Sequence, residues 1–164
     1  MASPAVQPPI TAPTQCVPRE LLESPLFLLG RLGYEVKTEV MDAFEAAGFS
    51  AYCYSVLAVL DEGDRETQAT IADTLKIDRG QLVGILDELE EHELIERKRD
   101  PNDRRRHLVS LTRSGKRQLT GYRRLARRLE DELLGPLGEG ERAQLRGLLQ
   151  RIAGARDTRY VPRP

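Results

Sequence analysis

Two short amphipathic patterns meet in residues 67–90, which read TQATIADTLKIDRGQLVGILDELE. Thr67 and Asp78 stand before the two patterns, and both are residue types that cap the amino end of a helix. The apolar residues after each cap recur every three or four positions, as in an amphipathic helix: Ile71, Ala72, Leu75, Leu82, Ile85, Leu86 and Leu89. Only Lys76 and Ile77 connect the two patterns, so this segment predicts a helix-turn-helix.

A different periodicity follows in residues 94–111, which read LIERKRDPNDRRRHLVSL. Pro101 is the second residue of Asp-Pro-Asn-Asp, a position where proline favours a type I turn. After the turn, Val109 and Leu111 alternate with polar residues and therefore share one face of an extended segment. These residues predict a two-stranded β-hairpin with an arginine-rich tip.

Longer helices are predicted on both sides of these two motifs. An apolar stripe over residues 28–47 stops at Gly48, and Ser50 can cap the helix that follows. Thr112 can cap a long helix after the hairpin, and a last helix follows a Gly-Pro break at 135–136. The predicted fold class is mainly α with a small β-hairpin, a winged helix-turn-helix flanked by helices.

The two ends of the chain contrast with this middle part. Residues 1–20 are predicted to be a disordered Pro-rich arm, since five of the ten prolines lie in the first 18 residues. Residues 155–164 are predicted to be a frayed tail. Residues 21–154 are predicted to form a single domain, with the winged lobe at 50–112 and dimerisation helices at 21–48 and 113–154. The apolar stripes of these helices are too long to be buried within one small lobe.

Charge is strongly segregated along the chain, although the net charge is only -1. Residues 95–128 hold thirteen Lys and Arg but only three Asp and Glu, so that the remainder is acidic. A field this local suggests a polyanionic partner. For the arginines at 123–128 a merely solvated helix face remains an equal alternative.

These motifs together resemble the MarR family of winged-helix regulators over residues 24–154. The resemblance rests on the recognition-helix pattern at 77–90, on Leu-Ile-Glu-Arg at 94–97, on Asp-Pro-Asn-Asp-Arg-Arg-Arg at 100–106 and on the closing residues 108–112. It implies that helix 78–90 enters a DNA major groove, with Gln81 able to pair with adenine and Arg79 with guanine or a phosphate. A purely capping role for Gln81 stays open. The contacts expected from the two helices are Thr67, Gln68, Thr70, Arg79, Gln81, Val83 and Gly84.

The hairpin tip is the second DNA contact that the resemblance implies. Arg105 should enter the minor groove, which suits a planar and weakly hydrated guanidinium, and Asp103 should orient it. The contacts expected from the hairpin are Arg99, Asp103, Arg104, Arg105 and Arg106. A flexible, merely solubilising loop is the alternative.

Two positions depart from the family pattern. Gly84 stands where the family often has a polar or basic residue, which removes a base contact and lowers helix stability by about 1 kcal/mol relative to Ala. Glu93 stands where the family usually has Gly, and a Glu does not readily adopt a left-handed conformation. A different helix cap is therefore expected at 92–93.

The function implied is that of a homodimeric transcriptional regulator, a repressor that binds an inverted repeat in double-stranded DNA and is released by a small ligand. The two recognition helices should lie about 34–36 Å apart. Family effectors are often small aromatic or phenolic compounds, and the side chains that could line such a site are Arg31, Tyr34, Tyr52 and Tyr54. Ordinary core packing of the tyrosines and solvation of Arg31 are the alternatives.

Other function classes find little support in the sequence. Two histidines do not form a metal cluster, and no catalytic signature is present, so neither a cofactor nor an enzyme is expected. We expect a cytoplasmic protein with no membrane partner, because no long apolar run and no secretory signal are found. Two alternatives remain: a winged-helix module that binds protein instead of DNA, and a redox-responsive regulator using Cys53 or Cys16.

Overall fold

The computed structural model describes residues 16–63, 66–101, 103 and 106–161. The chain falls into two units, Met1–Lys37 and Thr38–Pro164. The described part of the first unit contains the short helix α1 (Arg19–Leu22) and the beginning of α2 (Pro25–Ala46). Neither α1 nor this part of α2 has a buried residue, and Leu26 is 80% exposed. The first unit thus presents apolar side chains that nothing within it covers.

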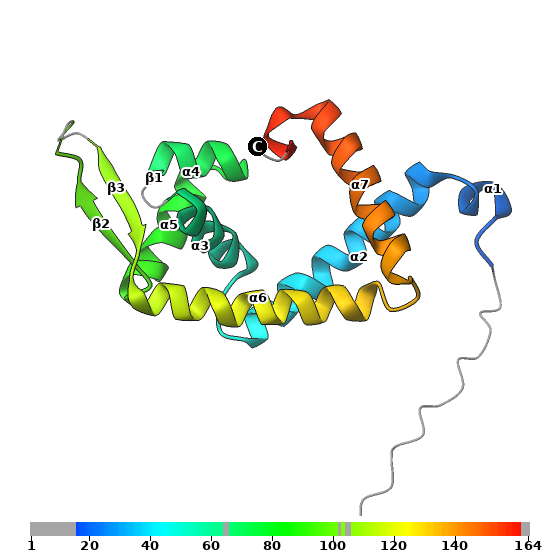
Figure 1. Cartoon of the computed structure of the whole chain (residues 1–164), viewed down its shortest axis with the longest axis horizontal. Coiled ribbons are helices and arrows are strands. Elements are labelled where there is room, and N and C mark those ends of the chain that lie inside the picture. Colours follow the sequence, from blue (N-terminus) through cyan, green and yellow to red (C-terminus); the bar gives the residue numbers. More distant parts are fainter. Residues whose placement is uncertain (1–15, 64–65, 102, 104–105, 162–164) are drawn as a thin grey trace, which may run out of the picture. The chain divides into compact units, whose positions relative to one another are not determined.

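The second unit carries the predicted helix-turn-helix and hairpin (Figure 1). After the end of α2 its elements are α3 (Ala51–Gly63), β1 (Glu66–Thr67), α4 (Gln68–Leu75), α5 (Arg79–Glu91), β2 (Ile95–Arg99), β3 (His107–Leu111), α6 (Arg113–Leu133), α7 (Glu139–Arg156) and the 3-10 turn η1 (Thr158–Tyr160). The strands form an antiparallel sheet in the order β1-β3-β2. The mainly helical fold with a small wing is therefore confirmed, and β1 is a strand that the sequence did not predict.

Four predicted caps begin α3, α4, α5 and α6. The hydroxyl of Ser50 accepts a hydrogen bond from the Cys53 N–H at 3.4 Å, and that of Thr67 accepts from Thr70 at 3.1 Å. Asp78 Oδ1 accepts from Gly80 at 2.8 Å and from Gln81 at 3.3 Å. Thr112 Oγ1 accepts from Gly115 at 2.9 Å. Helices α3, α4, α5 and α6 therefore each start where a side chain satisfies otherwise unpaired N–H groups.

The core is centred on α3, which packs against α4, α5, α6 and β3. Its apolar face supplies Cys53, Val56, Leu57 and Leu60, all of them fully buried. Gly115, near the start of α6, is buried against the backbone of Leu94. A Cβ built on Gly115 would lie 2.0 Å from the carbonyl oxygen of Leu94. Only a glycine lets α6 begin this close to the strand that follows α5.

The carboxyl end of α5 differs from the expectation. Glu93 has a φ of 56°, so the left-handed cap is kept, and the prediction of a different cap is wrong. The Glu93 N–H donates to the Glu90 carbonyl and the Leu94 N–H to the Leu89 carbonyl, both at 2.9 Å, which is a Schellman motif. Leu89 and Leu94 are both buried, as is usual for this motif. Tertiary packing therefore imposes a backbone conformation that a glutamate disfavours.

The chain after α7 also differs from the predicted frayed tail. Asp157 caps η1 by accepting from the Arg159 N–H at 3.0 Å, and it pairs with Lys76 Nζ at 2.5 Å. The guanidinium of Arg159 donates both to Asp157 and to the carbonyl of Asp73 in α4. Hydrogen bonds from Arg159 and Lys76 hold the pKa of the Asp157 carboxyl well below its usual range. Charged contacts thus fix a segment that has too few apolar residues to be recognised from the sequence.

Candidate nucleic-acid interface

The amino end of α4 is held against the wing by Thr67. This residue pairs with Leu108 of β3 in the sheet, and its hydroxyl caps α4. The Oγ1 atoms of Thr67 and Thr70 lie 2.7 Å apart. The remaining N–H groups of the first turn of α4 carry the positive end of the helix dipole, which favours an anion such as a phosphate.

The first turns of α5 present three side chains to solvent. Arg79, Gln81 and Val83 are exposed, whereas Leu82, between the last two, is buried in the core. Gln81 contributes its backbone N–H to the Asp78 cap, and its side chain has no hydrogen bond within the described residues. Its amide therefore remains available for a base edge. Val83 is 44% exposed, which is what contact with a thymine methyl group requires.

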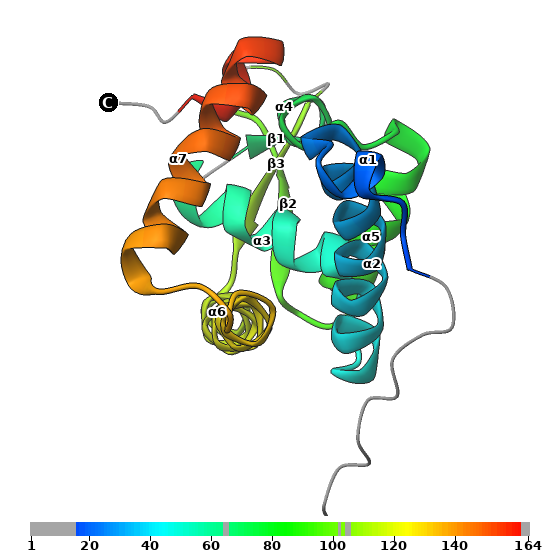
Figure 2. The same ribbon diagram turned by 90° about the vertical axis from the view of Figure 1, so that its right-hand side faces the viewer.

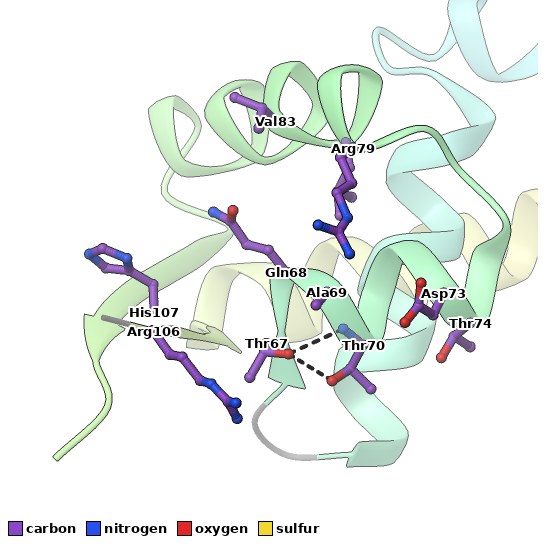
Figure 3. Close-up of a pocket in the computed structure, with 11 residues that line it drawn as sticks. Thr67, Gln68, Ala69, Thr70, Asp73, Thr74, Arg79, Val83, Arg106 and His107 are labelled. Carbon is purple, nitrogen blue, oxygen red and sulfur yellow. Dashed lines mark hydrogen bonds between the residues drawn. The ribbon is translucent and has the colours of Figure 1, made fainter. Parts of the chain in front are cut away.

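An open groove of about 590 Å³ lies between α4, α5 and β3. Figure 3 shows Arg79 extending from α5 toward α4 across this groove. Six of the predicted contacts are among the residues that line it, from three separate segments: Thr67, Gln68, Thr70, Arg79, Val83 and Arg106. The others that line it are Ala69, Asp73, Thr74, Leu82 and His107. The structure therefore brings these six together, while the predicted contacts Gln81, Gly84, Arg99 and Asp103 lie outside the groove lining.

Arg97 joins the wing to the recognition helix, a role that sequence reasoning missed. From β2 its Nε donates to Glu90 Oε2 at 2.8 Å and its Nη2 to Asp87 Oδ1 at 2.7 Å. Its backbone N–H donates to Glu90 Oε1 at 3.3 Å. Hydrogen bonding by Arg97 lowers the pKa of the Glu90 carboxyl, and the same bond raises the pKa of Arg97. The three-residue spacing of Asp87 and Glu90, which places both on one face of α5, was the available signal.

The described part of the wing tip closes through backbone and side-chain contacts. The Asp100 N–H donates to the Arg106 carbonyl at 3.0 Å, and the Arg106 N–H donates to the Asp103 carbonyl at 2.9 Å. Arg106 Nε also lies 3.2 Å from Asp103 Oδ2. Arg104 and Arg105 lie outside the described residues, so the predicted pairing of Asp103 with Arg105 stays a prediction. Arg99 is exposed at the end of β2.

Comparison with known proteins places this arrangement in a family. The profile of the MarR family matches residues 49–107. The transcriptional repressor NicR of Pseudomonas putida is 30% identical over 146 residues, which cover 88% of this chain and 91% of NicR. The chain belongs to the MarR family. It is a transcriptional regulator with a DNA-binding winged helix, as the motifs of residues 67–112 indicated.

Solved structures of MarR-type regulators agree with this assignment. The repressor CouR bound to a 23-mer DNA duplex matches with a TM-score of 0.75 and 34% identity, covering 85% of this chain and 99% of CouR. CouR from Rhodococcus jostii RHA1 bound to p-coumaroyl-CoA matches with a TM-score of 0.69 and 29% identity, covering 83% and 96%. The fold therefore occurs in both a DNA complex and a ligand complex.

The four effector candidates of this MarR-family chain lie in both units. In the first unit, Arg31 pairs with Glu35 at 2.9 Å, and Tyr34 is 72% exposed. In the second unit, Tyr52 and Tyr54 are half-buried against the core, and the ring of Tyr54 stacks on Phe44 at 5.5 Å. A packing role is therefore present for Tyr54, while Tyr34 lies at the surface of the first unit.

The cysteines differ sharply in environment. Cys53 is fully buried, and its Sγ lies 3.4 Å from the Ser50 hydroxyl. Burial raises the pKa of the Cys53 thiol, which disfavours the reactive thiolate and supports a packing role. Cys16 is exposed.

The described residues contain no cluster of three or more His, Cys, Asp or Glu side chains that could hold a metal. Among them, no single helix is long and apolar enough to cross a membrane.

Proposed function

We propose that this chain is a homodimeric repressor that reads an inverted repeat in double-stranded DNA and releases it when a small aromatic ligand binds. The observation that carries the proposal is the groove between α4, α5 and β3, where six predicted contacts from three segments converge. The proposal implies a regulator that acts in the cytoplasm and has no enzymatic activity.

Each part of the groove has a distinct task in this proposal. The amino end of α4 binds phosphates through backbone N–H groups, which fixes the register of the lobe on the duplex. Gln81 and Val83 contact base edges, and Arg79 bridges toward a guanine or a phosphate. Arg105 enters the minor groove beside the recognition site.

Two copies of the lobe are needed to read an inverted repeat. The described helices leave large apolar side chains exposed, which supports burial against a second copy: Leu26, Leu28, Leu29 and Leu32 of α2, and Leu148, Leu149 and Ile152 of α7. Paired recognition helices would then contact successive major grooves about 34–36 Å apart.

Ligand control would act through this spacing. The p-coumaroyl-CoA complex of CouR supports an aromatic acid or its thioester as the effector class. Such a ligand shifts the equilibrium only if it binds the DNA-competent and the released dimer unequally. Arg31, Tyr34, Tyr52 and Tyr54 are the side chains proposed to sense it.

Gel-shift titration with promoter fragments from the neighbourhood of its own gene tests DNA binding. Arg105→Ala should weaken operator binding by about 1–3 kcal/mol and leave the dimer intact. Gln81→Ala should relax the preference at one base position, and an equal loss on all sequences would assign Gln81 to the cap alone. The logarithm of the affinity should fall by about 0.9 per neutralised phosphate for each unit of log salt. Failure to bind any fragment would favour the protein-binding module instead.

A further inference from the structure

The exposed face of α6 carries a dense positive charge that the proposed operator contacts do not use. Between residues 113 and 129 the helix has no acidic residue, and its acids are confined to the last turn. Seven cations are exposed on this helix: Arg113, Lys116, Arg117, Arg123, Arg124, Arg127 and Arg128. At about 100° per residue they fall within an arc of about 140°, and they extend over about 22 Å of helix. We call this surface the α6 basic face.

Internal ion pairs neutralise little of this charge. Arg123 pairs with Asp61 of α3 at 2.8 Å, and Arg128 lies 3.9 Å from Glu132. Arg117 donates to the hydroxyl of Ser114, which carries no charge. The remaining four cations of the α6 basic face have no ion pair within the part of the chain that the structure describes. Like charges held this close repel one another, so the face favours an anionic partner.

The α6 basic face lies away from the groove that reads DNA. Figures 1 and 2 both place α3 between α4 and α6. Helix α6 packs its apolar side, with Leu119 and Tyr122 buried, against α3, so its cations point to the opposite side. One straight duplex seated in the groove of this lobe therefore does not reach the α6 basic face of the same lobe.

The residue composition of the α6 basic face argues against a membrane or a protein as its partner. A membrane-binding helix needs its apolar side free for lipid, but the apolar side of α6 is in the core. A protein interface usually has an apolar centre, and Leu133 is the single large apolar residue exposed among the described residues of α6. What remains is a partner recognised by charge alone.

We propose that the α6 basic face binds the phosphate backbone of a second, sequence-unrelated DNA segment while the groove holds the operator. Six of the seven cations are arginines, whose planar guanidinium binds phosphate oxygens in pairs. Each DNA strand carries one charge per about 3.4 Å of helix axis, so the length of the face matches about six phosphates. This proposal rests on the proposed function, and it makes each operator-bound dimer a bridge between two duplexes.

A two-duplex capture assay with the full chain tests the bridge. An operator duplex of about 25 base pairs is fixed on beads and loaded with protein, and the retained protein is measured. A fluorescent duplex of unrelated sequence is then added at low salt, and its capture is measured. Wild-type protein should capture the unrelated duplex. The charge-reversal variant Arg124→Glu/Arg127→Glu should capture at least about tenfold less of it, while its retention on the operator beads stays within about twofold of wild type.

A matched control and a milder variant accompany this test. Arg146→Glu/Arg151→Glu makes the same change in charge on exposed positions of α7 and should capture the second duplex like wild type. Arg124→Gln/Arg127→Gln only neutralises the face and should give an intermediate loss. It replaces the reversal variant if that variant does not fold.

Several outcomes would overturn the proposal. Equal capture of the unrelated duplex by wild type and the charge-reversal variant would do so, as would no capture by wild type. If the variant lost operator retention to the same extent as capture, the face would be assigned to the operator contact. Conversion to monomers in sedimentation would instead assign it to a second copy of the chain. If wild type is not retained by the operator beads, the proposed function fails. In that case, the fluorescence anisotropy of the unrelated duplex, titrated with wild type or with the charge-reversal variant in solution, still tests whether the α6 basic face binds DNA.

Discussion

Arg97 of β2 and Glu90 of α5 are joined by side-chain and backbone hydrogen bonds, with Nε to Oε2 at 2.8 Å and the Arg97 N–H to Oε1 at 3.3 Å. The pair ties the wing to α5, and these are the two elements proposed above to contact adjacent grooves of the DNA. The Arg97 side chain is only 20% exposed, so its bonds are better protected from solvent than those of a typical surface pair.

Arg97→Ala should lower the free energy of unfolding by about 1–2 kcal/mol, because two carboxylates lose a charged donor. Urea denaturation measures this change, and Arg99→Ala at the exposed end of the same strand should stay within about 0.5 kcal/mol of wild type. Operator affinity should fall for Arg97→Ala even under conditions where the variant is fully folded. Unchanged stability and affinity would show that the pair does not position the wing.

The same pair predicts a pH dependence. The pKa of Glu90 is lowered in the folded protein by its bonds to Arg97. The pair therefore contributes stability above the unfolded pKa of about 4.3, and this contribution is lost as the pH falls through the folded value. Between pH 7 and the acid side of this transition, wild type should lose more stability than Glu90→Gln. Parallel curves for the two proteins in denaturant titrations would contradict this.

Gly115→Ala should destabilise the protein by about 1–3 kcal/mol, because the new Cβ would collide with the Leu94 carbonyl oxygen. Gly121 in the same helix is the matched control. Its built Cβ meets nothing closer than 4.0 Å, so Gly121→Ala should stabilise α6 by up to about 1 kcal/mol. Thermal melts of both variants check the contrast, and the same sign for both would refute the close approach.

Glu93→Gly should stabilise the protein by about 1 kcal/mol, since glycine adopts the left-handed conformation without the steric penalty of a side chain. Glu91→Gly, two residues earlier and still within α5, should instead destabilise it by about 0.5–1 kcal/mol. Chemical denaturation of the pair measures both changes. A destabilised Glu93→Gly would mean that the glutamate side chain makes a contribution larger than its backbone strain.

The caps and the apolar faces could be predicted from the sequence because each depends on neighbours a few residues away. Thr67 and Asp78 satisfy N–H groups two or three positions later, so their local spacing was sufficient. The groove itself was not predicted, but six of the residues that line it are among the contacts predicted from the order of helix, turn, helix and hairpin. Strand β1 could not be predicted, since two residues show no alternation and pair only with β3, about forty positions later.

The other differences between the predicted and the observed structure have two causes. Some contacts join residues far apart in the sequence, and some backbone conformations oppose the preference of the local residue. Glu93 takes a conformation that its own side chain disfavours, because the packing of Leu89 and Leu94 decides the turn. The segment after α7 is held by Lys76 and by the carbonyl of Asp73, and nothing in its own composition indicates these partners. Arg97 stood in a basic run, where its pairing with α5 was hidden among arginines expected to face solvent or DNA.

Thr67 is at once the last residue of β1 and the cap of α4. Because Thr67 also pairs with Leu108, it connects the hairpin directly to the first turn of α4. At the opposite edge of the sheet, Arg97 of β2 connects the hairpin to α5. Among the described residues, these contacts thus tie α4, α5 and the hairpin together into one DNA-binding lobe. Under the proposed function, a ligand would therefore move each lobe as a whole, and the quantity that it has to alter is the separation of the two lobes in the dimer.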